Sequence, residues 1–250
     1  MKPFLLLVAA ICGCSASLAQ PPAAYRIEGQ IRGLRNVTVR LAHYFGHSQY
    51  IIKDTARIDS SGRFVFVGEK PLPQGLYLVM PPTASQRYID LVVSHPFFAF
   101  QTDTTNYVAT MRVTASPDNE VYYAYQQYLQ RLADEARAIE IQAQLRADAA
   151  ANQLARQQLT ALNRQAAAFR KTVVAQNDSL LAIRLIRGGA DPDVPAPPRL
   201  KNGQTDSTFQ YRYYKNHFWD TFDFNDERLV RSPVFQRKID RYLQDRKSVV

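Results

Sequence analysis

Residues 118–176 contain neither glycine nor proline, and this long uninterrupted stretch constrains the fold more than any other feature. Ser116 and Asp118 are both residue types that cap helices, and Glu120 suits a first helical turn. Apolar residues then follow at alternating spacings of three and four, which is typical of amphipathic helices. We expect an antiparallel helix pair or one long arm, with a break within residues 146–152. The apolar positions are Tyr122, Tyr125, Leu129, Leu132, Ala136, Ile139 and Ala143, followed by Leu159, Leu162, Ala166, Phe169 and Val173.

The chain before this stretch alternates apolar and polar residues in short runs separated by turn signals such as Ser60-Ser61-Gly62. Alternation with a period of two predicts half-buried strands, and regular spacing of such strands predicts a β-sandwich or small barrel. We expect about eight strands, over residues 25–31, 36–44, 53–58, 63–67, 76–80, 88–93, 97–100 and 108–113.

Beyond the helical stretch the pattern breaks into shorter pieces. Residues 178–186 predict a short helix that stops at Gly188-Gly189, and the prolines of residues 191–198 require an extended connection. A final helical block is expected from about Gln210. The chain is therefore predicted to be an α+β protein, with an antiparallel β-sandwich-like domain over residues 24–115 and a helical domain over residues 117–250.

The N-terminus has the form of a secretory signal peptide over residues 1–19. Lys2 precedes a short apolar run, and small residues lead to a predicted cleavage between Ala19 and Gln20. The alternative is a lipoprotein signal, in which Cys14 is acylated and anchors the protein to a membrane. Either route predicts export to the periplasm or cell envelope.

Both cysteines, Cys12 and Cys14, lie inside this predicted signal. After cleavage at Ala19 the mature chain would hold no cysteine, which excludes disulfides, thiol exchange and thiolate metal sites.

Charge and motifs exclude several further classes. The formal net charge is +9, but the basic residues are scattered among acidic ones, so we expect no nucleic-acid partner. Gly188-Gly189 lacks the context of a phosphate loop, and no Gly-x-Ser-x-Gly sequence occurs. His43, His47 and His95 are interpreted as turn or surface histidines. No catalytic or cofactor-binding residue and no cofactor are predicted.

The stretch YYKNHFWDTFDFNDERLVRS at residues 213–232 concentrates reactive side chains. His217 and Asp220 are three apart on a predicted helix, so their side chains can meet, and Asp223 is near. A metal-dependent or hydrolytic enzyme centred on these three residues is therefore one hypothesis. Two ligands are too few for a closed metal site, and no metal site is predicted.

A structural role explains the same stretch. A stripe of apolar residues would pack the helix, Asn225 would cap a new turn, and Ser232-Pro233 would restart a further helix. The stripe comprises Tyr211, Tyr214, Phe218 and Phe222, and the buried face of the last helix comprises Phe235, Ile239, Tyr242 and Leu243.

Residues 207–233, STFQYRYYKNHFWDTFDFNDERLVRSP, resemble a domain-of-unknown-function family that precedes thioredoxin-like domains in exported thiol:disulfide interchange proteins of Bacteroidota-type bacteria. The β-rich part is similar to the small domain that opens those proteins, in YRIEGQIRGL at 25–34, KDTA at 53–56, GRFVF at 62–66 and LPQGLY at 72–77. The thioredoxin-like domain of that family, with its Cys-x-x-Cys, has no counterpart here. We therefore expect either a truncated form or a stand-alone module.

The resemblance implies a non-catalytic interaction or positioning module whose partner is a thioredoxin-like domain or a client protein. The aromatic content of the β-rich part raises the alternative of glycan or peptide binding.

Overall fold

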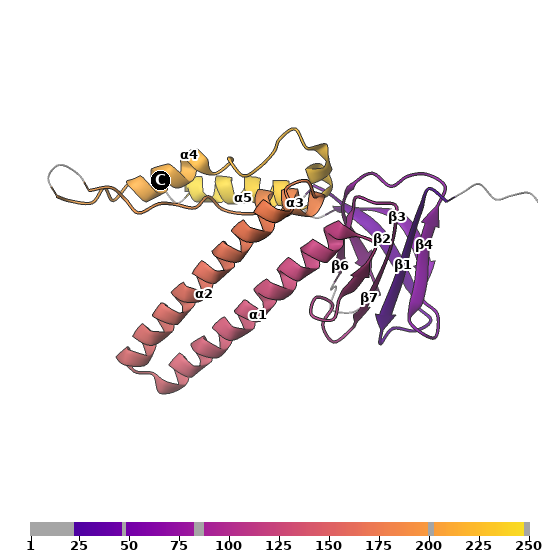
Figure 1. Cartoon of the computed structure of the whole chain (residues 1–250), viewed down its shortest axis with the longest axis horizontal. Helices are drawn as coiled ribbons and strands as arrows, with labels where there is room; N and C mark the ends of the chain where they lie inside the picture. Colours follow the sequence, from indigo (N-terminus) through magenta and orange to yellow (C-terminus); the bar gives the residue numbers. More distant parts are fainter. Residues whose placement is uncertain (1–22, 47–48, 83–87, 200–202, 248–250) are drawn as a thin grey trace, which may run out of the picture.

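The computed structural model describes residues 23–46, 49–82, 88–199 and 203–247. Its N-terminal part is a β-sandwich of eight strands, as the alternation predicts (Figure 1). The strands are β1 (Tyr25–Arg32), β2 (Thr38–Phe45), β3 (Gln49–Arg57), β4 (Arg63–Gly68), β5 (Gly75–Met80), β6 (Ile89–Val93), β7 (Phe97–Asp103) and β8 (Arg112–Thr114).

The strands form two four-stranded sheets, in the orders β4-β1-β7-β8 and β3-β2-β5-β6. The pairs are antiparallel except for β1 and β7, which run parallel with Ile27 opposite Phe98. Alternate residues of β1 are buried, from Tyr25 and Ile27 onwards, because successive side chains of a strand point to opposite faces. The predicted α+β class is confirmed, with this one parallel pair as a departure from an all-antiparallel sandwich.

The last predicted strand, over residues 108–113, is mostly wrong. Residues 107–110 form turns in which Asn106 accepts hydrogen bonds from the backbone N–H groups of Val108 and Ala109. A side-chain amide that satisfies local backbone donors competes with strand pairing. Of the predicted residues, only Arg112 and Val113 lie in a strand, β8, which pairs with β7.

The glycine-free stretch forms an antiparallel pair of long helices, α1 (Pro117–Arg146) and α2 (Ala149–Gln176). Ser116 is the N-cap of α1, and its side chain accepts a hydrogen bond from the backbone of Asn119. Ala147 ends α1 in the left-handed conformation, and Asp148 caps α2. The break therefore lies within the predicted residues.

The remaining helices are α3 (Leu181–Gly188), α4 (Phe209–His217), the 3₁₀ helix η1 (Glu227–Arg231) and α5 (Val234–Lys247). The predicted final block is thus broken into three pieces. Since α4 ends at His217, Phe222 does not continue its stripe, and Tyr211 is exposed. Asp226, not Asn225, caps η1.

A new helix begins after Ser232, as predicted. The Ser232 hydroxyl oxygen accepts a hydrogen bond from the backbone N–H of Val234, the first residue of α5. The face of α5 differs from the prediction. Leu243 is exposed, while Lys238 is buried with its ammonium over the ring of Phe218.

One hydrophobic core runs from the sandwich into the helices. It joins buried residues of both sheets with Tyr122 and Tyr123 of α1, Leu181 of α3, and Leu229 of η1. Gly188 ends α3, and a side chain there would crowd Phe222 and Val234. The helices α1, α3 and η1 are therefore packed onto the sandwich rather than connected to it only by the chain.

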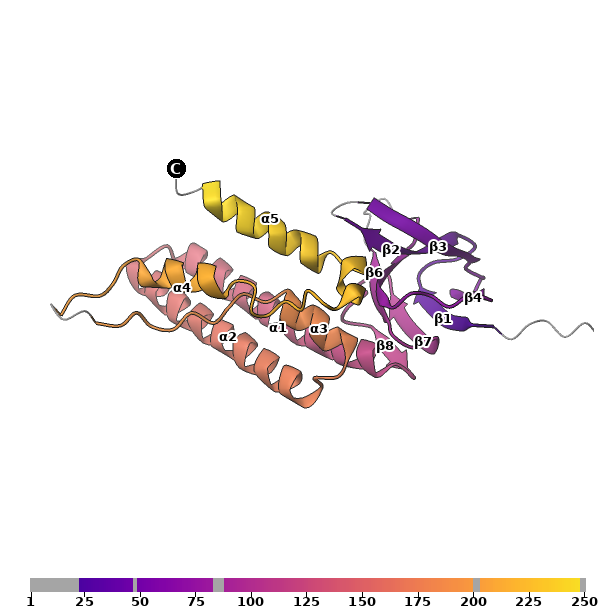
Figure 2. The ribbon, with the colours of Figure 1, turned by 90° about the horizontal axis from the view of Figure 1, so that it is seen from above.

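Away from this core the helical part divides. The α1–α2 hairpin projects to one side of the sandwich, and α4 and α5 form a second projection (Figure 1). Seen from above, α5 lies apart from the hairpin (Figure 2). The helices α1 and α5 converge toward the sandwich and diverge away from it (Figures 1 and 2).

Candidate functional site

The beginning of α1 binds the edge of the second sheet through backbone groups of β6. The side-chain amide of Asn119 accepts from the N–H of Val92 at 2.8 Å and donates to its carbonyl oxygen at 2.8 Å. The hydroxyl of Tyr123 donates to the backbone carbonyl of Asp90 at 2.6 Å. These bonds satisfy an edge that would otherwise be open to pairing, and they fix α1 against the sandwich.

Asp118 connects α3 to this contact between α1 and β6, which we call the joint. This buried carboxylate accepts from the backbone N–H of Ala182 at 2.8 Å and from the hydroxyl of Ser94 at 2.6 Å. It satisfies an amide in the first turn of α3, one of the groups that a helix leaves without an internal partner. The elements around the joint are therefore held in fixed positions.

A cleft of about 320 Å³ opens at this joint, between the sandwich and the helices. We call it the Asp90 cleft. Ligand sites favour such interfaces and have volumes of this order. The polar and charged residues that line it are Tyr44 of β2, Asp90 of β6, Tyr122, Tyr125 and Gln126 of α1, Arg170 of α2 and Arg237 of α5.

Asp90 is the one acidic residue among the described residues that line the cleft. Burial raises its pKa to about 6, against the opposing effects of a hydrogen bond from Tyr122 and the charge of Arg237. The Tyr122 hydroxyl lies 3.0 Å from Oδ2 of Asp90. A carboxyl group with such a pKa changes charge near neutral pH, and groups of this kind are concentrated at functional sites.

Burial also raises the pKa of the Tyr44 and Tyr122 hydroxyls, and the nearby Asp90 carboxylate adds to both shifts. Both tyrosines therefore remain neutral hydrogen-bonding groups at physiological pH. The cleft combines one titratable carboxyl group, neutral hydroxyls and two guanidinium groups.

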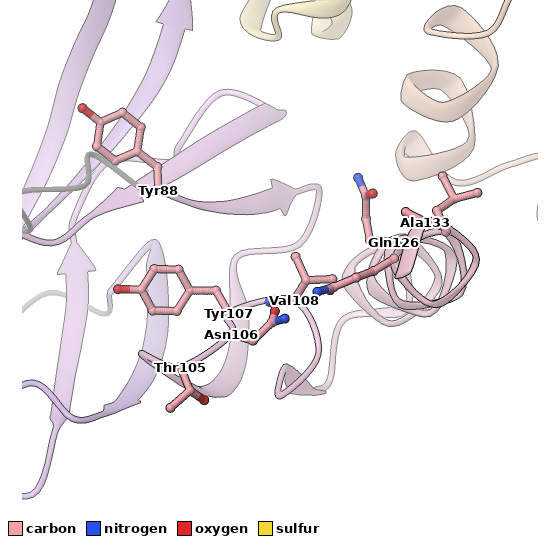
Figure 3. A pocket seen from close by; sticks show the side chains of 9 residues that line it. Tyr88, Thr105, Asn106, Tyr107, Val108, Gln126 and Ala133 are labelled. Atoms are coloured by element: carbon pink, nitrogen blue, oxygen red, sulfur yellow. Dashed lines mark hydrogen bonds between the residues drawn. The ribbon is translucent and has the colours of Figure 1, made fainter. Parts of the chain in front are cut away.

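A second hollow, larger in volume, lies along α1 (Figure 3). We call it the α1 groove. It measures about 590 Å³, and both hollows are lined by Gln126 and Leu129. In the close-up, Gln126 and Ala133 project from α1, while Tyr88 and the segment 105–108 lie on the sandwich side.

The α1 groove is lined by groups that could contact the backbone and side chains of a bound polypeptide. Gln130 Oε1 is buried and has no hydrogen-bond partner in the part of the chain that the structure describes. On the sandwich, the Tyr50 ring lies between those of Tyr44 and Tyr88, with centroid distances of 5.4 and 5.7 Å. Aromatic rings and amides thus extend from the Asp90 cleft into the α1 groove.

The structure brings together two of the three residues of the enzyme hypothesis. His217 Nδ1 lies 2.6 Å from Asp220 Oδ2, and both side chains are substantially exposed. Asp223 instead accepts from the backbone N–H of Asn225 at 2.9 Å and faces Arg184 at 4.0 Å. Among the described residues, no group of three or more histidine, cysteine and acidic side chains is arranged to hold a metal ion.

The remaining predicted positions have different outcomes. Cys14, Ala19 and Gln20 lie outside the described residues, as does His47. His95 is exposed in the turn between β6 and β7, as expected, whereas His43 is buried on β2 with Nδ1 2.8 Å from the Tyr44 carbonyl oxygen. No helix in the described ranges is both long and apolar enough to cross a membrane.

Sequence reasoning missed the Asp90 cleft and its link to Arg237. One signal was present, because Asp90 is a lone acid in the otherwise apolar run Ile89-Asp90-Leu91-Val92-Val93. A buried carboxyl group in a strand needs partners. The hydrogen bond from Tyr122 and the nearby charge of Arg237 depend on tertiary packing and leave no local pattern.

Comparison with known proteins gives one family match. A family model described as Domain of unknown function (DUF4369) matches residues 25–122. The match covers the sandwich and the first turns of α1, so it includes Asn119 and Tyr122 of the joint. A domain of unknown function is therefore found over the sandwich, whereas the sequence predicts one over residues 117–250; the link to thiol:disulfide interchange proteins stays a prediction.

The other comparisons add little. No curated protein matches the chain. Among solved structures, a 5-hydroxyisourate hydrolase from Klebsiella pneumoniae aligns with 16% identity over 37% of this chain and 98% of that chain, with a TM-score of 0.25. A likeness this weak carries no argument about activity.

Proposed function

We propose that the protein is an exported, non-catalytic interaction module that holds a polypeptide partner in the Asp90 cleft and the adjoining α1 groove. The partner class follows from the resemblance described above, which implies a thioredoxin-like domain or its client. The periplasm or cell envelope is the proposed location, on the basis of the signal-like residues 1–19.

The observation that carries the proposal is the continuity of the two hollows along one face of α1, at a joint held by Asn119 and Asp118. A rigid groove loses little conformational entropy on binding, so more of the contact energy remains as affinity. The tyrosine rings that line the two hollows offer large contact area to a polypeptide.

The proposal is tested with reduced and carboxymethylated α-lactalbumin as an unfolded polypeptide probe. Leu129 lines both hollows, so Leu129→Arg places a long charged side chain in them. We expect it to weaken binding about tenfold or more, because it displaces the ligand and buries a charge. Binding is measured by isothermal titration calorimetry.

Leu145→Arg is the matched control, since Leu145 is a leucine of α1 that is 80% exposed near the end of the hairpin. It should bind the probe like the unmodified protein. Absence of binding by the unmodified protein, or equal losses in the two variants, contradicts the proposal. The mature protein should also show no turnover in a thiol-exchange assay, because both cysteines precede Ala19.

A further inference from the structure

The charge of the Asp90 cleft indicates which chemical group it receives. Arg170 and Arg237 contribute two positive charges from two different helices, and Asp90 contributes one negative charge when it is ionised. The lining is therefore net positive, within a chain of net charge +9. Both guanidinium groups would repel a cationic ligand.

Neither arginine is fully neutralised by the protein. Arg237 is exposed, and within the described ranges its guanidinium group has no hydrogen bond or ion pair, although its charge acts on Asp90. Arg170 contacts Asp193 at 3.3 Å, but Asp193 also binds Lys171 at 2.9 Å. One carboxylate is thus shared by two cations, and the cleft retains unused guanidinium donors.

We propose that the Asp90 cleft binds an oxyanion of the ligand, a carboxylate or a phosphate group, through Arg237 and Arg170. Guanidinium groups present paired donors that match the geometry of these anions. This inference rests on the proposed function, and it identifies the part of the partner that enters the cleft. A peptide C-terminus or an acidic side chain would supply a carboxylate.

Asp90 adds a pH dependence to this binding. The groups that face it are Tyr44 from β2, Tyr122 and Tyr125 from α1, Arg170 from α2 and Arg237 from α5. Tyrosines with raised or ordinary pKa values and arginines do not titrate near neutral pH. Protonated Asp90 no longer repels the anion and gains a hydrogen-bond donor, so affinity for a carboxylate should rise as pH falls through about 6.

The test uses three probes, titrated into the mature protein up to about 10 mM by calorimetry. They are an N-acetylated tetrapeptide with a free C-terminal carboxylate, an amidated tetrapeptide with one internal glutamate, and inorganic phosphate. All the peptides are N-acetylated, so the amidated tetrapeptide without glutamate is the uncharged comparison. We expect at least one anionic probe to bind, and the three arms distinguish C-terminal, side-chain and phosphate sources.

Arg237→Gln should weaken binding of that probe about tenfold, since charge-assisted hydrogen bonds contribute on this scale. The matched control is Arg241→Gln, which removes the same charge one turn further along α5, where Arg241 pairs with Asp191. It should bind like the unmodified protein. A carboxylate probe should also bind several-fold more tightly at about pH 5.5 than at about pH 7.5.

Three results would overturn the inference: no anionic probe binds, the uncharged peptide binds equally well, or Arg237→Gln and Arg241→Gln have the same effect. Leu129-dependent binding of the unfolded polypeptide without any role for Arg237 would leave the proposed function standing alone. Binding of an oxyanion that depends on Arg237, without binding of the unfolded polypeptide, would support the oxyanion site and contradict the proposed function.

Discussion

At the scale of single residues, Asp90 links the stability of the fold to pH. Its pKa is about 6 in the folded protein and near 3.8 in an unfolded chain, so the folded state binds more protons between these values. The free energy of unfolding should therefore fall as pH rises from about 4 to about 6, and the penalty should persist at higher pH. A carboxylate that destabilises the fold in this way is expected at a site kept for binding.

Asp90→Asn removes the charge and keeps an oxygen that can accept from Tyr122. The substitution should change the free energy of unfolding relative to the unmodified protein. We expect this change to be about 2 kcal/mol more stabilising at pH near 7.5 than at pH near 4, because burial raises the pKa of Asp90 from 3.8 to about 6. Urea unfolding at the two pH values measures this difference. Asp103→Asn is a control of opposite sign, because hydrogen bonds from Thr105 lower the pKa of the exposed Asp103. A pH-independent effect of Asp90→Asn would contradict the assignment.

At the scale of elements, the turn between α1 and α2 depends on an unfavourable backbone conformation. Ala147 has a φ of 51°, and its N–H donates to the carbonyl oxygen of Ala143 at 3.0 Å. Glycine adopts this left-handed conformation without the steric penalty of a Cβ atom. Ala147→Gly should therefore raise the free energy of unfolding by about 0.5–1 kcal/mol, after allowance for the greater freedom of glycine in the unfolded chain.

Thermal and urea unfolding would measure this gain. The same exchange at Ala124, an exposed position inside α1, should instead cost about 1 kcal/mol, because glycine disfavours helix interiors. Loss of stability in both variants would show that the left-handed turn is not a source of strain.

The elements also show how far sequence reasoning reaches. The alternation of residues 25–31 and the seam through Leu132 and Leu162 report which face is buried, so most strands and both long helices could be predicted. The pieces after residue 209 could not, because Phe222 packs against Gly188 from beyond the end of α4. The cleft was missed for the same reason: its charged residues come from separate elements that only the folded chain brings together.

At the scale of the whole molecule, the continuous core predicts that the sandwich does not fold as a stable unit without the helices. The sequence predicts a domain over residues 24–115, and in the structure Tyr122, Leu185 and Leu229 belong to the same core as the sandwich. Without them the fragment would expose apolar surface over β5 and β6, and Val92 would lose its bonds to Asn119. Each buried aromatic or leucine side chain contributes about 1.5–3 kcal/mol, and a domain is stable by only about 5–15 kcal/mol.

A fragment of residues 24–115 should therefore show no cooperative urea transition, whereas residues 24–250 should unfold in one transition seen equally by circular dichroism and by fluorescence of Trp219. A fragment of residues 24–122 should be intermediate, since it restores Asn119 and Tyr122 but not α3 or η1. If the shortest fragment unfolded cooperatively, the cleft would lie between two independently folded domains. Its geometry could then change when a partner binds, and the rigid joint inferred from Asn119 and Asp118 would lose its role in affinity.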